Sequence, residues 1–234
     1  MPCWTGGAGG YGSGMRAHIV WDWNGTLFDD VEVVVAASNA ACAEVSLPPL
    51  TVQQYREQYR VPIVDFYERL LGRAPTTEEW LLMDASFHRH YETGRDGCGL
   101  AQGVEALLGD WSRTGSQSLL SMYAHDDLVP LVRRFGLERH FLRVEGRLST
   151  SGVSGKAEHL VRHLTALADQ DVTAAGTVLI GDVVDDALAA AHVGAHAVLY
   201  AGGAHARSEL ERVGVPVADT LEQAVAYAQE LVKS

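Results

Sequence analysis

The stretch that decides the fold is HIVWDWNGTLFDD, residues 18–30. Its first half is apolar and rich in β-forming side chains, and it ends at Asp22, just before a turn that contains Gly25. Short apolar runs that end at a polar, glycine-containing turn are typical of buried strands. The sequence therefore predicts a buried strand over 17–23, with a carboxylate at its carboxyl end.

Size and charge exclude several classes of protein. The chain has 234 residues, 47% of them hydrophobic, which is enough for one core with a smaller appendage. A formal net charge of −12 argues against a nucleic-acid partner, because phosphate backbones are bound by clustered Lys and Arg. No window of about 18 uninterrupted apolar residues predicts a membrane span. The odd, scattered cysteines indicate a reducing compartment, so we expect a cytoplasmic protein without disulfides.

The remaining sequence indicates three parts. Residues 1–16 are glycine-rich, do not resemble a secretory signal, and are expected to be a disordered leader. Residues 31–96 show helical spacing, with no strand signal. Farther on, strands alternate with helices, with strands expected at 116–123, 141–146, 176–182 and 196–203. This alternation predicts an α/β fold, a doubly wound parallel sheet with helices on both faces. We therefore expect an α/β core formed by 17–30 and 97–234, with 31–96 inserted as an all-helical cap.

Four separated segments are predicted to meet at one edge of this sheet, because ligands of such folds bind beyond the carboxyl ends of the strands. The segments are Asp22 to Thr26, Ser121, Lys156, and Gly181 to Asp186. A carboxylate can attack phosphorus, and carboxylates also bind Mg²⁺. Hydroxyls and helix N-termini hold phosphate oxygens, and a lysine stabilises charge in the transition state. Together these groups suit phosphoryl transfer.

These segments resemble the motifs of the haloacid dehalogenase (HAD) superfamily, in particular its phosphoglycolate phosphatase-like members with a helical C1-type cap. The family's D-x-D-x-T motif stands as DWNGT at 22–26, and its strand-closing Ser or Thr as Ser121 in LLSMY. Its helix-opening lysine stands as Lys156 in GKAEHL, and its G-D-x-x-x-D motif as GDVVDD at 181–186. The motifs occur in the family's order, and the resemblance spans about 17–203.

The resemblance implies a Mg²⁺-dependent hydrolase that acts on a small phosphorylated metabolite through an aspartyl-phosphate intermediate. Asp22 is the implied nucleophile and a metal ligand, and Asn24 is the implied ligand through its backbone carbonyl. Asp182 and Asp186 complete the implied metal site. Asp185 is a further carboxylate whose role the sequence does not separate from that of Asp186.

The resemblance also implies a phosphate-binding set, consisting of Gly25, Thr26, Ser121 and Lys156. Lys156 is thus both an implied catalytic residue and a phosphate ligand, and Thr26 also supports the loop around the nucleophile. In the cap, Arg56, Arg60 and Arg73 are candidates for holding an anionic substrate, although each is also typical of a solvated helix.

Asn24 departs from the family pattern. Phosphatases of the family carry an aspartate there, which protonates the leaving oxygen and then deprotonates the attacking water. An amide cannot exchange protons in this way near neutral pH, and such help is worth about 10²–10⁴-fold in rate. The sequence therefore predicts slow turnover at a site whose implied catalytic residues are Asp22, Asn24 and Lys156.

Several alternatives stay open. In one, the substrate has a good leaving group that needs little protonation. In another, a residue such as His125 replaces the missing aspartate. In a third, deamidation of Asn24 before Gly25 restores the aspartate in part of the population. A further alternative is a non-catalytic relative that binds a phosphorylated ligand or a protein partner. Separately, His159 and His163 have the one-turn spacing of a zinc pair but no evident third ligand, so we expect both to face solvent.

Overall fold

The computed structural model describes residues 16–148 and 155–233, so the predicted leader lies, except for Arg16, outside the described residues. The core is a six-stranded parallel sheet of order β5-β4-β1-β6-β7-β8. Its strands are β1 (His18–Trp21), β4 (Ser116–Ala124), β5 (Val144–Arg147), β6 (Thr177–Gly181), β7 (His196–Tyr200) and β8 (Val217–Ala218). The predicted doubly wound α/β fold is confirmed.

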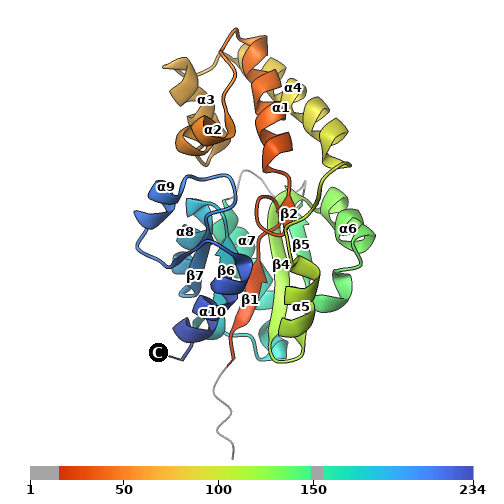
Figure 1. Ribbon diagram of the computed structural model, residues 1–234. Coiled ribbons are helices and arrows are strands. Elements are labelled where there is room, and N and C mark those ends of the chain that lie inside the picture. The colour runs from red at the N-terminus through yellow and green to blue at the C-terminus, as the bar shows by residue number, and fades with distance from the viewer. Residues whose placement is uncertain (1–15, 149–154, 234) are drawn as a thin grey trace, which may run out of the picture.

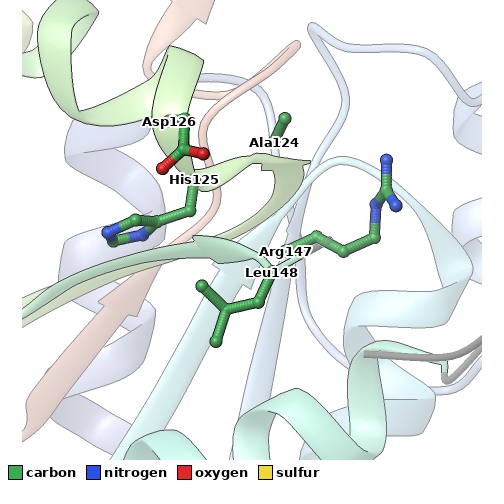
Figure 2. A pocket seen from close by; sticks show the side chains of 5 residues that line it. All are labelled: Ala124, His125, Asp126, Arg147 and Leu148. Atoms are coloured by element: carbon green, nitrogen blue, oxygen red, sulfur yellow. The ribbon is translucent and has the colours of Figure 1, made fainter. Parts of the chain in front are cut away.

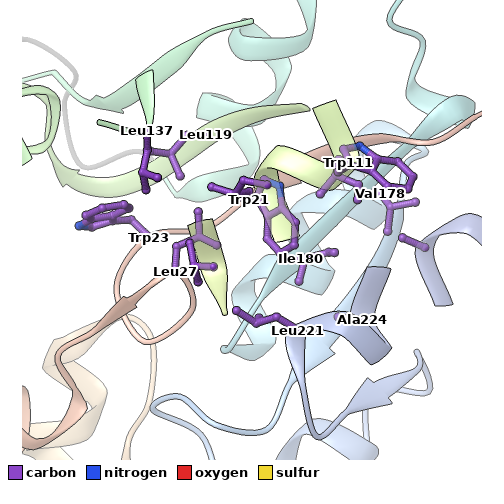
Figure 3. Packing of buried hydrophobic residues seen from close by; sticks show 14 of the residues in the cluster. Trp21, Trp23, Leu27, Trp111, Leu119, Leu137, Val178, Ile180, Leu221 and Ala224 are labelled. Carbon is purple, nitrogen blue, oxygen red and sulfur yellow. The ribbon is translucent and has the colours of Figure 1, made fainter. Parts of the chain in front are cut away.

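Helices cover both faces of the sheet (Figure 1). One face packs against α5 (Val104–Ser112), α6 (His125–Arg134) and α10 (Leu221–Leu231), and the other against α7 (Lys156–Ala166), α8 (Val184–Val193) and α9 (Arg207–Glu211). Short 3₁₀ turns lie at Glu138–His140, Ala168–Gln170 and Ala174–Gly176. Because side chains alternate along a strand, Ile19 and Trp21 point into the first cluster, shown in part in Figure 3, and Val20 into the second. The apolar run of β1 is therefore buried on both faces.

The inserted helices form a separate layer beyond the carboxyl ends of the strands (Figure 1). They are α1 (Val31–Glu44), α2 (Val52–Gln58), α3 (Ile63–Leu71) and α4 (Thr77–Arg95). They enclose a hydrophobic cluster of their own, which includes Val35, Tyr55, Phe66 and Met83. These helices occupy the interval where the cap is expected, and the limits of leader, core and cap stay predictions.

A two-stranded antiparallel sheet, which the sequence did not predict, joins the two ends of the insertion. It pairs β2 (Phe28–Asp29) with β3 (Gly99–Leu100). The backbone N–H of Ala101 extends the pairing by donating a hydrogen bond to the carbonyl oxygen of Leu27 at 3.0 Å. The chain thus enters and leaves the cap at one place on the core.

The expectation that His159 and His163 face solvent is wrong, because both are buried. His163 Nδ1 lies 3.0 Å from Glu145 Oε2, and its Nε2 lies 2.8 Å from Ser118 Oγ. The same hydroxyl lies 2.9 Å from His18 Nε2. A buried polar network therefore crosses from α7 through β5 and β4 to β1, which is how these polar groups are satisfied inside the core.

Among residues 16–148 and 155–233, no helix combines the length and the apolar composition that crossing a bilayer requires. Within the same residues, Cys42 and Cys98 are free thiols.

Candidate active site

Three buried carboxylates meet at the carboxyl edge of the sheet. Asp22 follows β1, Asp182 follows β6, and Asp186 lies in the first turn of α8. One oxygen of each lies within 4.8 Å of the others. The strands explain this convergence, because β1 and β6 are neighbours with Trp21 opposite Ile180, so both chains leave the sheet side by side.

Lys156 is the cation of this cluster. It begins α7, is 3% exposed, and places Nζ 2.5 Å from Asp22 Oδ1. It also forms an ion pair with Asp186. Burial by itself would lower the pKa of Lys156, but the two carboxylates outweigh it and raise that pKa above the ordinary value. The ammonium is therefore charged at any physiological pH.

Negative charge exceeds positive charge in the cluster, since one ammonium faces three carboxylates. Burial raises the pKa of Asp22 to about 7, with repulsion from Asp186 adding to the effect and Lys156 opposing it. Burial, followed by repulsion from Asp22 and Asp186, also raises the pKa of Asp182. A divalent cation relieves such repulsion, and hard carboxylate oxygens are the ligands that Mg²⁺ prefers. The cluster has the donors to hold this ion.

Asp182 is fixed by its surroundings. Thr26 Oγ1 donates to its Oδ1 at 3.3 Å, and the backbone N–H of Ala204 donates to its Oδ2 at 2.6 Å. Gly25 adopts a left-handed φ of +67°, and a Cβ there would lie 2.5 Å from Asp182 Oδ2. Only glycine suits both the conformation and the space. Thr26 is fully buried behind this carboxylate, so its hydroxyl supports the metal-ligand candidate, whereas its predicted phosphate contact stays a prediction.

The structure separates Asp186 from Asp185, which the sequence did not. Asp186 is fully buried, and its Oδ2 accepts a hydrogen bond from Val183 N at 3.1 Å. Asp185 is half-buried and lies outside the carboxylate cluster. Its pKa is raised by burial and then by Asp186. Asp186 is thus the better candidate for the third metal ligand.

Ser121 lies in β4, two residues beyond Leu119, which pairs with Trp21 at the end of β1. This register places Ser121 just past β1 on the same edge as Asp22. Its hydroxyl is buried and accepts a hydrogen bond from the backbone N–H of Tyr123 at 3.1 Å.

His125, an alternative proton carrier, begins α6, and its Nδ1 accepts a hydrogen bond from Gly146 N at 3.1 Å. It lines a pocket with Asp126, Arg147 and Leu148 at the ends of β4 and β5 (Figure 2). None of the clustered carboxylates lines this pocket.

Asn24 turns its amide toward the cap. Its Nδ2 donates to Asp30 Oδ2 at 2.6 Å and to the Tyr91 hydroxyl at 2.7 Å. Sequence reasoning missed both partners. Asp30 carried a weak signal as the last residue of the opening stretch, whereas Tyr91 carried none, because its role depends on how α4 packs against the core.

The cap arginines proposed for substrate binding are engaged with protein groups. Arg56 donates to the carbonyl oxygens of Gly202 at 2.6 Å and Gly203 at 2.7 Å. Arg60 and Arg73 form ion pairs with glutamates. Arg56 thereby attaches α2 to the loop after β7, so its observed role is to hold the cap on the core.

Comparison with known proteins agrees with the motifs. A family model described as HAD-hydrolase-like matches residues 153–224, which include Lys156 and GDVVDD. A search of curated protein sequences finds no significant match.

Solved structures match over nearly the whole chain. A haloacid dehalogenase-like family hydrolase from Streptococcus pneumoniae matches with TM-score 0.74 and 17% identity, over 92% of this chain and 99% of that one. A predicted phosphatase from Clostridium acetobutylicum matches with TM-score 0.75 and 15% identity, over 92% and 99%. A predicted phosphoglycolate phosphatase from Haemophilus somnus matches with TM-score 0.68 and 17% identity, over 94% and 98%. These likenesses confirm the resemblance in fold, and the family model confirms it over the last two motifs.

Proposed function

We propose that this HAD-like chain is a phosphatase-type hydrolase that requires Mg²⁺ and acts on a small phosphorylated metabolite. The observation that carries the proposal is the buried cluster of Asp22, Asp182 and Asp186 around Lys156. The descriptions of two similar structures as phosphatases support it. The Mg²⁺ would be held by the three carboxylates and by the backbone carbonyl of Asn24.

In the proposed reaction, an oxygen of Asp22 attacks phosphorus, and the bond between phosphorus and the substrate oxygen breaks with its electron pair leaving on that oxygen. Water then attacks phosphorus, the aspartyl-phosphate bond breaks, and inorganic phosphate and the Asp22 carboxylate are released. Lys156 and Ser121 hold the phosphoryl oxygens and stabilise the charge that spreads over them. When bound, Mg²⁺ supplies the positive charge that lets an anionic substrate approach a carboxylate.

The reaction needs one proton at the leaving oxygen and releases one from water. The amide of Asn24 can neither donate the first proton nor accept the second. We therefore infer slow turnover of ordinary alkyl phosphates, and faster turnover of acyl or aryl phosphates, whose leaving groups need less protonation.

The surroundings of the site fit a small substrate. The helical cap lies over the carboxyl edge, and the net charge of −12 makes a nucleic-acid partner unfavourable. The free thiols of Cys42 and Cys98 suit a reducing compartment, which supports a cytoplasmic location.

Hydrolysis of p-nitrophenyl phosphate with and without Mg²⁺ tests the proposal. We expect slow, Mg²⁺-dependent turnover that Asp22→Asn abolishes, and a phosphorylated Asp22 peptide in acid-quenched wild-type protein. Asp29→Asn is the control, because this exposed residue of β2 makes the same charge change outside the cluster. Turnover that survives in Asp22→Asn would contradict the proposed nucleophile. Mg²⁺ binding without any turnover would instead favour a non-catalytic protein that binds a phosphorylated ligand.

A further inference from the structure

Asp30 is a buried carboxylate at the root of the cap. It follows β2, immediately precedes α1, and is 1% exposed. Its Oδ1 accepts a hydrogen bond from the backbone N–H of Gly25 at 2.9 Å, and its Oδ2 accepts from Asn24 Nδ2 at 2.6 Å and from the Tyr91 hydroxyl at 2.7 Å. Three donors therefore converge on this carboxylate. The contacts include two residues of the loop that carries Asp22.

Tyr91 brings the cap into the same arrangement. It lies on α4, is 4% exposed, and its hydroxyl also accepts a hydrogen bond from Asn24 Nδ2 at 2.7 Å. Asn24, Asp30 and Tyr91 thus form a closed ring of three hydrogen bonds. Since Asn24 belongs to the nucleophile loop and Tyr91 to the far helix of the cap, this ring ties the two together.

The residue types at positions 24 and 30 depend on each other. Asn24 must donate to Asp30, and an amide nitrogen is a donor whereas an ionised carboxylate is only an acceptor. An aspartate at position 24 would place two carboxylates in contact, at the 2.6 Å that now separates Nδ2 from Oδ2. Like charges this close cannot both stay ionised without a large penalty. An amide at 24 is therefore the partner that a carboxylate at 30 requires.

We propose that Asn24, Asp30 and Tyr91 form a cap lock, in which Asn24 is a hydrogen-bond donor that holds α4 against the nucleophile loop. Asp30 is the positioning residue of this lock, acting on the loop through Gly25 and Asn24. The lock accounts for the amide at the place where the family carries its proton-transfer aspartate. Its effect on catalysis rests on the proposed function, whereas the lock itself does not.

The cap lock lies apart from the contacts that hold α2 on the core. Arg56 fastens α2 to the carbonyl oxygens of Gly202 and Gly203. The lock fastens α4, at the other end of the insertion. Arg95, at the C-terminal end of α4, also contacts the Tyr123 hydroxyl and forms an ion pair with Asp127 of α6. Breaking the lock therefore loosens α4 around Tyr91, while the contacts of Arg95 and of Arg56 remain.

Hydrogen exchange on the full chain tests the lock without any substrate. Tyr91→Phe removes the hydroxyl and keeps the ring, and we expect exchange over 86–95 and at Gly25 to speed up by about 10-fold or more, as for the loss of hydrogen bonds to a charged group. Tyr67→Phe is the matched control, because it removes a buried cap hydroxyl within α3. Equal exchange in the two variants would overturn the lock.

Exchanging the two side chains is the sharper test. We expect Asn24→Asp and Asp30→Asn each to lose protection over 86–95, and the double variant Asn24→Asp/Asp30→Asn to recover it to within about threefold, because it restores one donor and one carboxylate. Losses that simply add in the double variant would overturn the proposal. If Asn24→Asp does not fold, Asp30→Asn is combined with Tyr91→Phe instead. Losses of protection that simply add in that double variant would show that Asp30 and Tyr91 are not coupled, which would also overturn the lock.

Activity of these variants separates the lock from the proposed function. With p-nitrophenyl phosphate and Mg²⁺, we expect Asn24→Asp to gain little, because its carboxylate faces Asp30. The double variant should gain most of the roughly 10²–10⁴-fold that acid–base help provides. An equal gain in the single variant would overturn the matched pair. Inactivity of every variant would count against the proposed function, while the exchange measurements would still decide the lock.

Discussion

The ammonium of Lys156 lies 2.5 Å from the carboxylate of Asp22, and both side chains are buried where α7 begins and β1 ends. Removing one partner of a buried ion pair leaves the other uncompensated, which typically costs about 3–5 kcal/mol. Here the loss of the ammonium would leave three carboxylates uncompensated at once. The cluster is therefore a place where stability, metal binding and catalysis depend on the same charges.

Lys156→Met should lower the free energy of unfolding by about 3–5 kcal/mol in metal-free buffer near neutral pH, as measured by urea denaturation. Lys233→Met is the matched control, since Lys233 is the other lysine of the chain and is exposed, so its loss should change stability by less than about 0.5 kcal/mol. Similar losses in the two variants would show that Lys156 does not neutralise the cluster.

Mg²⁺ should stabilise the wild-type chain and fail to stabilise Asp182→Asn. Binding to the folded state alone contributes about 2.7 kcal/mol at a free Mg²⁺ concentration near 100 times Kd. The check is thermal unfolding across a Mg²⁺ titration. Asp169→Asn, at an exposed residue outside the cluster, serves as the control and should respond like wild type. An undiminished Mg²⁺ response in Asp182→Asn would place the ion elsewhere.

Gly25→Ala should cost stability and weaken Mg²⁺ binding together. The left-handed φ costs a non-glycine residue about 1–2 kcal/mol, and the new methyl group would displace Asp182. Gly72→Ala separates the two effects, because Gly72 has a φ of +70° with no atom within 4 Å of the place that a methyl group would occupy. It should show the backbone cost and retain Mg²⁺ affinity. Calorimetric Mg²⁺ titration of both variants decides the matter, and unchanged affinity in Gly25→Ala would contradict the fit around Asp182.

Acid should remove a stabilising contribution that the buried network of His18 makes to the fold. Burial, and then the nearby His163, lowers the pKa of His18 from its ordinary value of 6.5 to about 4. Between these values the unfolded chain binds a proton that the folded chain does not, so this contribution is fully present above about pH 6.5 and is lost as pH falls toward 4. The expected loss of this contribution between about pH 7 and pH 5 is about 2 kcal/mol, whereas the raised pKa of Asp22 acts in the opposite direction over the same range.

Urea denaturation of wild type and His18→Gln across this pH range measures the loss as a difference, because the carboxylates are common to both proteins. Between pH 7 and pH 5, His18→Gln should lose about 2 kcal/mol less stability than wild type. The variant starts from a lower stability because its contacts with Ser116 and Ser118 change. His192→Gln, at an exposed position of α8, should keep the slope of wild type. Parallel curves for His18→Gln and wild type would remove His18 as the cause.

The convergence of Asp22, Lys156 and Asp182 was predictable from the sequence, because strand ends of a parallel sheet share one edge whatever the loops between them do. The strands β1, β6 and β7 were likewise readable as short apolar runs, whereas the two-residue β8 was not predicted. The two-stranded sheet of β2 and β3 could not be predicted, because two-residue strands have no periodicity to detect.

Contacts across the interface between cap and core were also beyond the sequence. Arg56 sits on an amphipathic helix where a solvated side chain is the usual outcome, and Tyr91 is one aromatic residue among several on α4. Their partners, Gly203 and Asp30, are fixed only when the two layers dock. The burial of His163 was missed for a similar reason, since its partner Glu145 comes from a neighbouring strand.

The position of β1 in the middle of the sheet has a consequence for biosynthesis. Its two neighbours are β4 and β6, which the ribosome completes only at residues 124 and 181. The cap helices, by contrast, pack mainly on one another and are complete at residue 95. Domains generally fold as units in the order of their synthesis, so a nascent chain would assemble the cap while the buried strand β1 still waits for its partners. That interval is when the growing polypeptide is most exposed to aggregation and most in need of a chaperone.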